Sequence, residues 1–310
     1  MSKVVYICSA GHSGSTLLDM LIGSHSKITS LGEISQLPKN LSLNTDCTCG
    51  KKVKHCEFWD KVLKRVDDEL KVQSKIFPYS LNLGYFTARI VVDSKHQNKW
   101  NEIKKKVVLG LYYLSLKSFF PVPQVFISKI INGAKNSFVL YKHVTDVMGG
   151  EYIVDSSKNY LKAISLYKEN PEKVRIIVLS RDGRGVFYSG RKRGFSKNES
   201  LGAWKKYYTR SLPLIEKHVN SNHILKIHYE DLASSTANEL AKISAFIGVE
   251  FEENMLDFSS KIHHLTNGNN MRFRSSEVKL DQSWKQCASV SDLEFFETNA
   301  GFLNKKLGYD

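Results

Sequence analysis

The sequence predicts an α/β fold with three layers, α/β/α, around a central parallel sheet. Short β-branched and apolar runs alternate with segments at helical spacing, and two of these runs end in glycine-bearing turns that lead directly into helices. Strands that alternate with helices are joined by right-handed crossovers, which cover both faces of a parallel sheet. The length of 310 residues suits one such domain with an insertion, so we expect a single domain over residues 1–310.

The predicted elements follow the chain in two similar units. Residues 3–10 (KVVYICSA) form the first strand, the loop GHSGST follows, and LLDMLIGSH begins a helix. Residues 174–193 repeat this order with the strand VRIIVLS, the turn RDG and the helix RGVFYSGRKR. Two more strands are predicted at 151–157 and 223–232. Lysine-bearing helical segments at about 60–148 predict a helical insertion, either a lid on the sheet or an acceptor-binding region.

Composition and charge narrow the class of protein. The chain has 42% hydrophobic and 25% charged residues, a composition that excludes disordered and collagen-like proteins. The formal net charge of +14 predicts affinity for an anionic partner. The apolar stretch at 4–10 is too short for a secretory signal or a membrane span, and five cysteines, an odd number, favour a reducing compartment. We expect a cytoplasmic protein, with the basic apolar helices around 104–131 suited to the inner membrane surface.

The loop after the first strand has the features of an anion cradle. Gly11 and Gly14 allow a tight turn, while Ser13, Ser15 and Thr16 offer hydroxyls beside the free amides that begin a helix. A P-loop that hydrolyses nucleotides reads GxxxxGK followed by Ser or Thr, and this loop has no such lysine. The loop is therefore P-loop-like, with a simple Ser/Thr helix cap as the alternative.

The second glycine-bearing turn carries basic side chains. Arg181 ends a buried strand, and Ser189 follows eight residues later, about two helical turns on, so both could reach one phosphate. Open parallel sheets bind ligands at the carboxyl ends of their strands, which favours a functional role for Arg181. Further positive charges could serve the ligand or form a solvated helix face: Arg184, Arg191, Lys192 and Arg193.

Together, HSGST after the first strand and RDGR with a serine eight residues after its first arginine resemble the two signatures of sulfotransferases that use 3′-phosphoadenosine-5′-phosphosulfate (PAPS). The segments LGEISQL, YIVDSSKNYL, HYEDLASSTANELAKISAFIG, HHLTNGNNMRF and CTCGKKVKHCEFW are similar to bacterial members related to the carbohydrate and tyrosylprotein branches. The resemblance implies PAPS as co-substrate and no metal. It implies a small-molecule, saccharide or lipid-linked hydroxyl acceptor, such as a carbohydrate, a glycolipid or another metabolite, and no nucleic acid partner.

The resemblance also implies roles for individual residues. Glu33 would be the general base that takes the proton of the acceptor hydroxyl, and Lys158 would supply positive charge to the bridging oxygen that leaves. The resemblance assigns the 5′-phosphosulfate to His12, Ser13, Gly14, Ser15 and Thr16, the 3′-phosphate to Arg181 and Ser189, and closure over the nucleotide to Gly268, Asn269 and Arg272. The alternative for Glu33 and Lys158 is a plain surface position.

His12 departs from the family pattern, since relatives usually carry lysine or arginine there. A histidine could donate a hydrogen bond to the bridging oxygen, provide charge as an imidazolium, or only shape the loop. Because its ordinary pKa is near 6.5, charge from His12 would depend on pH.

Three further groups of residues allow more than one interpretation. Cys47, Cys49, His55 and Cys56 could bind zinc, form a labile disulfide or be buried thiols. We favour thiols, because Cys-x-Cys is short for a zinc knuckle and adjacent residues ligate one ion poorly. The segment GAWKKYYTR spaces Trp204, Tyr207 and Tyr208 for core packing, with adenine stacking as the alternative. His263 and His264 are expected to orient the loop GNNMR rather than to catalyse.

We therefore expect a PAPS-dependent sulfotransferase and weigh it against two rivals. A P-loop kinase would turn over ATP with magnesium, which the missing GK[ST] disfavours. A basic protein without enzymatic activity would bind polyanions or membranes with a steep salt dependence.

Overall fold

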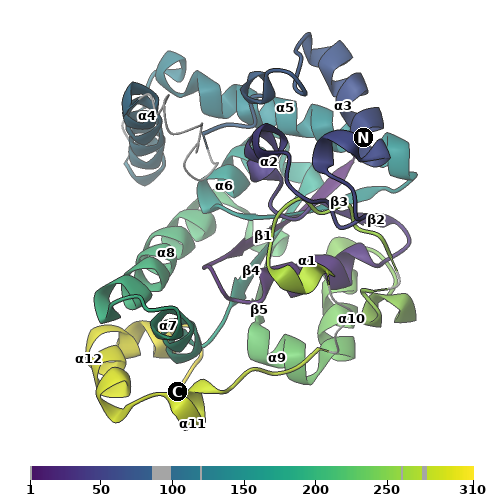
Figure 1. The fold of residues 1–310 in the computed structure, drawn as a ribbon. Helices are drawn as coiled ribbons and strands as arrows, with labels where there is room; N and C mark the ends of the chain where they lie inside the picture. Colours follow the sequence, from purple (N-terminus) through teal and green to yellow (C-terminus); the bar gives the residue numbers. More distant parts are fainter. Residues whose placement is uncertain (1, 86–98, 119–120, 260, 274–277) are drawn as a thin grey trace.

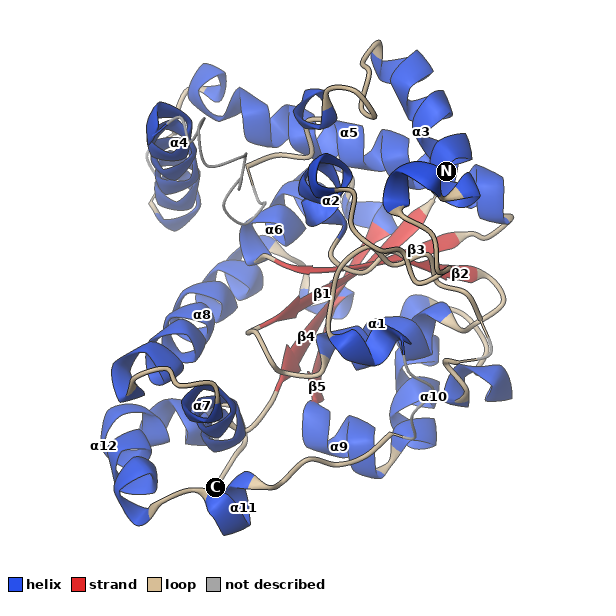
Figure 2. Ribbon diagram, viewed as in Figure 1, coloured by secondary structure: helices blue, strands red, loops and turns tan. Residues whose placement is uncertain are grey.

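The computed structural model describes residues 2–85, 99–118, 121–259, 261–273 and 278–310 (Figure 1). Its centre is a five-stranded, wholly parallel sheet in the order β2-β3-β1-β4-β5. Figure 2 shows helices on both sides of this sheet, so the predicted three-layer α/β/α fold is confirmed. The strands are β1 (Lys3–Ser9), β2 (Ile28–Ser30), β3 (Tyr152–Lys158), β4 (Val174–Ser180) and β5 (Ile224–His228).

Strand β1 divides the hydrophobic core into two parts, because alternate side chains point to opposite faces of the sheet. Tyr6 and Cys8 pack into one cluster, with α6 (Tyr160–Glu169) and α8 (Lys197–His218). Val5 and Ile7 pack into the other, with α1 (Ser15–Gly23), α9 (Tyr229–Ser234) and α10 (Thr236–Ile247). Because both faces of β1 are buried, most of its residues are apolar rather than alternating with polar ones.

Two strands differ from the sequence prediction. The strand expected at 223–232 ends at His228, because Tyr229 begins α9 and the polar residues that follow belong to that helix. The three-residue strand β2 was not predicted, since so short a segment carries no recognisable alternation. β2 pairs with β3 at the edge of the sheet, so residues 31–33 lie beside the carboxyl end of β3.

The segment expected to be a helical insertion, about 60–148, lies between β2 and β3 in the sequence. It contains α3 (Glu57–Leu70), α4 (Lys99–Lys117) and α5 (Gln124–Met148), which gather at one end of the molecule in Figure 1. Two parts of the predicted insertion, 86–98 and 119–120, lie outside the described residues. The Tyr141 hydroxyl of α5 donates a 2.6 Å hydrogen bond to Asp155 of β3, which fixes the insertion to the sheet. The remaining helices are α2 (Leu37–Leu43), α7 (Gly183–Lys192), α11 (Trp284–Cys287) and α12 (Val290–Lys306).

Within the described ranges, no helix combines the length and the apolarity that crossing a membrane would require.

Candidate functional site

The β1–α1 turn is shaped by one glycine. Gly14 precedes α1 with φ +86°, a left-handed conformation that side chains disfavour, and an added Cβ would lie 2.6 Å from the ring of Tyr229. Glycine is therefore required here for both conformation and space. Helix α1 begins at Ser15, and its first amides have no partner within the helix. The turn thus presents backbone donors at the positive end of a helix, an arrangement suited to an anion.

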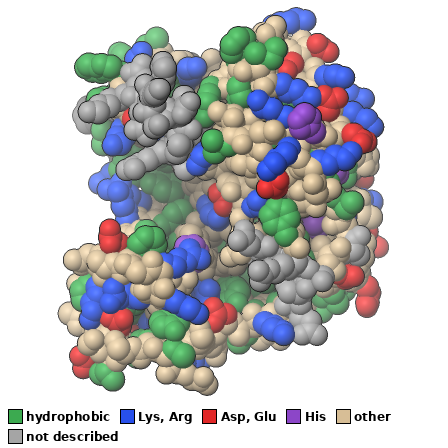
Figure 3. Space-filling model, viewed as in Figure 1, with side chains coloured by type: hydrophobic (Ala, Val, Ile, Leu, Met, Phe, Trp, Pro, Cys, Tyr) green, Lys and Arg blue, Asp and Glu red, His purple; other side chains and the backbone are tan. Residues whose placement is uncertain are grey.

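A cavity of about 380 Å³ lies over this turn. On the face shown in Figure 3 the surface is hollowed, and Lys and Arg side chains gather around the hollow. Glu33 and Lys158 meet inside the cavity, where Lys158 Nζ donates to Glu33 Oε1 at 2.5 Å. Lys158 has a strained φ of +67°, and the Tyr207 hydroxyl donates to its carbonyl at 2.6 Å. The structure therefore brings Glu33 and Lys158, two of the three predicted catalytic residues, together beside the turn, where both are partly buried.

His12 contacts Arg193, a residue for which the sequence predicted no specific role. Arg193 Nη1 donates to His12 Nε2 at 2.7 Å, so the imidazole accepts at that nitrogen and is neutral. Burial lowers the pKa of His12, and the Arg193 guanidinium lowers it further. The geometry disfavours the imidazolium considered from the sequence. Positive charge at this position comes from Arg193 instead.

The late loop predicted to close over the nucleotide does reach the first cavity. Gly268 and Asn269 line it, and the Asn269 amide donates to Thr16 Oγ1 at 3.3 Å. Arg272 does not line the cavity; its Nη1 donates to the Gly268 carbonyl at 2.8 Å and so braces the loop. Arg272 therefore acts on the cavity through the backbone of Gly268.

Arg181 is held rigidly at the end of β4. Its guanidinium donates to the His12 carbonyl at 3.2 Å and to the Asp281 carboxylate at 2.9 Å. It also stacks 4.5 Å from the centre of the Tyr229 ring. The same ring packs against Gly14, so one aromatic side chain positions both turns. At the start of α7, Asp182 caps the helix by accepting from the Arg184 amide at 2.9 Å.

A second cavity of about 410 Å³ opens beside Arg181. Ser189 lines it together with Arg181, as their spacing predicted. Arg193 lines both cavities, which therefore adjoin at this side chain. Sequence reasoning missed the contributions of Asp281 and Trp284, because they lie about a hundred residues from the turn in the sequence and belong to no motif.

The remaining basic residues of this region divide into two groups. Arg184 pairs with Asp182 at 2.7 Å and Arg191 with Asp292 at 3.3 Å, so both support the fold. Lys192 is exposed and lines the second cavity. Arg193 is exposed as well, so the expectation of a solvated helix face fits both residues, and both also line the second cavity.

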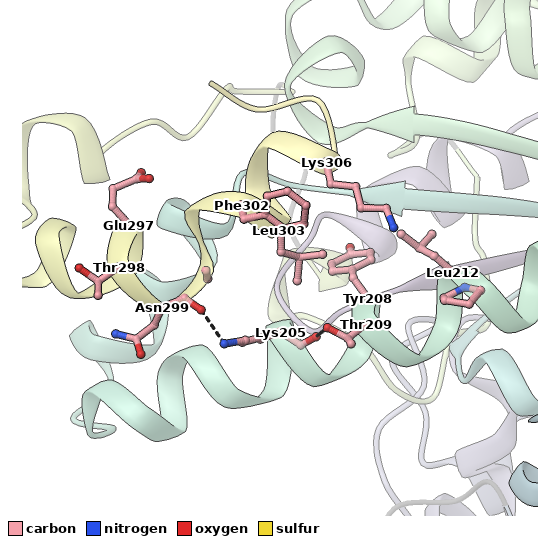
Figure 4. Close-up of a pocket in the computed structure, with 12 residues that line it drawn as sticks. Lys205, Tyr208, Thr209, Leu212, Glu297, Thr298, Asn299, Phe302, Leu303 and Lys306 are labelled. Carbon is pink, nitrogen blue, oxygen red and sulfur yellow. Dashed lines mark hydrogen bonds between the residues drawn. The ribbon is translucent and has the colours of Figure 1, made fainter.

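The aromatic residues of α8 form part of the core, as expected. Trp204 is 1% exposed and Tyr208 is fully buried. A separate cavity of about 510 Å³ lies between α8 and α12, where Tyr208, Leu212 and Leu303 contribute apolar walls (Figure 4). None of the predicted site residues lines it, and the Lys205 ammonium there is bound to the Asn299 carbonyl at 2.5 Å. This cavity is separate from the two that Arg193 joins.

The cysteine cluster forms with a different histidine from the one considered. His55 is exposed, whereas His264 approaches Cys47, Cys49 and Cys56 from a distant part of the chain. His263 is buried, and its Nε2 lies 2.9 Å from the Phe258 carbonyl, consistent with a role in holding the segment.

Comparison with known proteins finds curated relatives of similar sequence. Two curated relatives are candidate protein-tyrosine sulfotransferases: one of Caenorhabditis elegans is 26% identical over 148 residues, and one of Caenorhabditis briggsae is 25% identical over 148 residues. Each match covers 44% of this chain, and 57% and 52% of the two relatives. The chain thus spans about half the length of the curated relatives it matches.

Two solved structures share the fold. The sulfotransferase domain of the Synechococcus PCC 7002 olefin synthase has a TM-score of 0.54 and 16% identity, covering 100% of this chain and 97% of that domain. The sulfotransferase domain from the curacin biosynthetic pathway has a TM-score of 0.51 and 16% identity, covering 100% and 99%. Residues 5–253 match the family described as the sulfotransferase family. Because this match covers well over half of the 310 residues, the chain belongs to the sulfotransferase family of enzymes.

Proposed function

We propose that this enzyme transfers a sulfuryl group from PAPS to a hydroxyl acceptor. The observation that carries the proposal is the pair of cavities that adjoin at Arg193. PAPS has two separate anionic groups, the 5′-phosphosulfate and the 3′-phosphate, and so requires two anion sites at one edge of the sheet. ATP carries its phosphates in a single chain, which would leave Arg181 and Ser189 without a ligand.

Each cavity suits one end of the donor. The amides at the start of α1, with Ser15 and Thr16, would hold the 5′-phosphosulfate in the first cavity. In the second cavity the Arg181 guanidinium and the Ser189 hydroxyl would bind the 3′-phosphate by charge-assisted hydrogen bonds. The loop of Gly268 and Asn269, which contacts Thr16, would close over the first of these groups.

Glu33 and Lys158 divide the transfer chemistry between them. Glu33 would accept the proton of the acceptor hydroxyl as its oxygen attacks sulfur, which contributes roughly 10²–10⁴-fold to the rate. The bond from sulfur to the bridging phosphate oxygen breaks in the same displacement, and the electron pair stays on that oxygen. Lys158 and Arg193, both at the first cavity, would stabilise this negative charge. His12, neutral and bound to Arg193, would orient that guanidinium.

The acceptor we propose is a hydroxyl of a carbohydrate, a glycolipid or another metabolite. A tyrosine hydroxyl is the second candidate, because both curated relatives carry the name of protein-tyrosine sulfotransferases. Exposed apolar side chains on α4, Ile103, Val107 and Leu114, stand on a helix rich in lysine. They support contact with a lipid-linked acceptor at the inner, cytoplasmic membrane surface, and the helical insertion as the acceptor-binding region.

The donor assignment is tested by isothermal titration calorimetry of the full chain with 3′-phosphoadenosine-5′-phosphate (PAP) and, separately, with ATP and magnesium. We expect saturable binding of PAP that is at least tenfold tighter than binding of ATP, about 1.4 kcal/mol. Absence of PAP binding would overturn the assignment. Turnover of ATP would favour a kinase, and binding that only follows ionic strength would favour a polyanion binder.

The acceptor is tested by transfer of radioactive sulfate from PAPS to a panel of saccharides, glycolipids and tyrosine peptides. Labelled saccharide or lipid would support the proposed class. Label on tyrosine peptides alone would overturn that class and leave the donor assignment intact.

A further inference from the structure

We propose that Cys47, Cys49, Cys56 and His264 form a structural zinc site that fixes the loop beside the first cavity. The three Sγ atoms and the His264 Nδ1 atom all lie within 4.8 Å of one another. Cys47 and Cys56 are buried, and the other two residues are half-buried. The site lies outside both donor cavities and does not rest on the proposed function.

The distances within the cluster match a tetrahedral zinc centre. Zinc–sulfur bonds of about 2.3 Å place the sulfurs about 3.8 Å apart, and a zinc–nitrogen bond of about 2.0 Å places sulfur and nitrogen about 3.5 Å apart. The Cys56 Sγ lies 3.8 Å from that of Cys47 and 3.5 Å from that of Cys49. The His264 Nδ1 lies 3.3 Å from the Cys56 Sγ and 3.8 Å from the Cys47 Sγ. All three thiols are free, so they are available as ligands.

A short hairpin presents the first two cysteines. Asp46 and Lys52 form an antiparallel bridge, and the Cys47 amide donates to the Lys51 carbonyl at 2.9 Å. Gly50, with φ +84°, closes the turn by donating to the Cys47 carbonyl at 3.0 Å. The hairpin thus supplies the tight turn that Cys-x-Cys spacing alone did not predict.

The third cysteine and the histidine are placed by α3. Cys56 is the residue that precedes the helix, whose positive end favours a thiolate. The indole of Trp59 donates to the His264 carbonyl at 2.9 Å, and the His264 ring stacks 4.6 Å from that of Phe58. One objection to zinc was that His55 and Cys56 are adjacent and would ligate one ion poorly. The fourth ligand is instead His264, so this objection does not apply.

A metal at this point would connect two distant segments. The Thr48 amide donates to the Leu265 carbonyl at 3.0 Å, and the Leu265 amide donates to Thr48 Oγ1 at 2.9 Å, so the hairpin already pairs with the late loop. Four residues after His264, the loop reaches the first cavity at Gly268. Zinc would therefore hold the donor-binding loop in register with the body of the protein.

The first test is metal analysis of the full chain, purified without a metal-binding tag from zinc-supplemented culture and dialysed. We expect about one zinc ion per chain for the wild type. Cys49→Ser and His264→Ala should lose this zinc, and Cys287→Ser, which alters an exposed cysteine outside the cluster, should keep it. A wild type without zinc, whether its thiols are free or oxidised, would overturn the proposal. So would zinc retained by the double variant Cys49→Ser/His264→Ala.

A second variant keeps the test independent of folding failures. His264→Cys offers a fourth thiolate and should retain zinc, with no more than a small change in thermal stability. Replacement by Co²⁺ in the wild type should give the intense visible absorption of tetrahedral thiolate coordination. Weak, octahedral-type absorption would contradict the four ligands named here.

Discussion

The β1–α1 and β4–α7 turns have the same strand–turn–helix order but present hydrogen-bond donors by different means. The first uses backbone: Gly14 has a left-handed φ and leaves no space for a side chain. The second uses side chains: Arg181 and Ser189 face one cavity. There Gly183 is required by packing, because an added Cβ would lie 2.6 Å from the Trp204 ring. Under the proposed function, backbone amides would hold the end of the donor that is transferred, and charged side chains would anchor its 3′-phosphate.

The first prediction tests whether the transfer chemistry belongs to the first cavity, which Glu33 lines. Glu33→Gln keeps the shape of the Lys158 contact but removes the proton acceptor, so kcat should fall roughly 10²–10⁴-fold while PAP affinity stays within about threefold. Steady-state kinetics and calorimetry measure the two quantities. The matched control is Glu216→Gln, which alters an exposed pair with Lys226 at 2.7 Å. A Glu33→Gln variant with wild-type kcat would contradict the role of Glu33 as general base.

The next prediction tests the requirement for glycine at position 14 of the first turn. Gly14→Ala should lower the free energy of unfolding by about 2–3 kcal/mol, because it combines a left-handed φ with a clash against Tyr229. Gly11→Ala is the control, since its Cβ would meet no atom within 4 Å. Chemical denaturation measures both. Equal stability of the two variants would show that the turn does not depend on Gly14.

A smaller effect is expected in the second turn. Ser189→Ala removes one hydrogen bond to the proposed 3′-phosphate, which is worth about 1 kcal/mol, so PAP should bind roughly fivefold more weakly with kcat unchanged. Ser128→Ala, on an exposed position of α5, should leave both quantities unchanged. A fall in kcat without a change in PAP affinity would place Ser189 at the reacting group instead.

The smallest effect concerns His12 and pH. Because burial lowers the pKa of His12 in the folded protein, the unfolded chain binds the proton more readily. His12 should therefore cost stability as pH falls through its unfolded pKa near 6.5, and should change nothing between about pH 7 and 8. Denaturation of wild type and His12→Asn from pH 5 to 8 measures this. Loss of wild-type stability with rising pH, absent in the variant, would contradict a neutral His12.

Local patterns in the sequence were sufficient to predict both turns. Apolar runs predicted β1 and β4, and the glycines and Arg181 marked the positions of the two turns, because each of these features is encoded within about ten residues. Long-range features were not predictable in this way. Arg193 reaches His12, Asp281 holds Arg181, and His264 joins the cysteines only after the chain has folded.

The proposed role of Arg181 is to recognise the 3′-phosphate, and one pair of nucleotides can isolate this contact. PAP and AMP differ by that phosphate, so calorimetry of both with wild type and Arg181→Ala isolates the contact. The surface variant Arg65→Ala on α3 is the control. We predict that Arg181→Ala weakens PAP binding at least tenfold, about 1.4 kcal/mol, and AMP binding less than about twofold. An equal loss for both nucleotides would contradict the assignment of the second cavity.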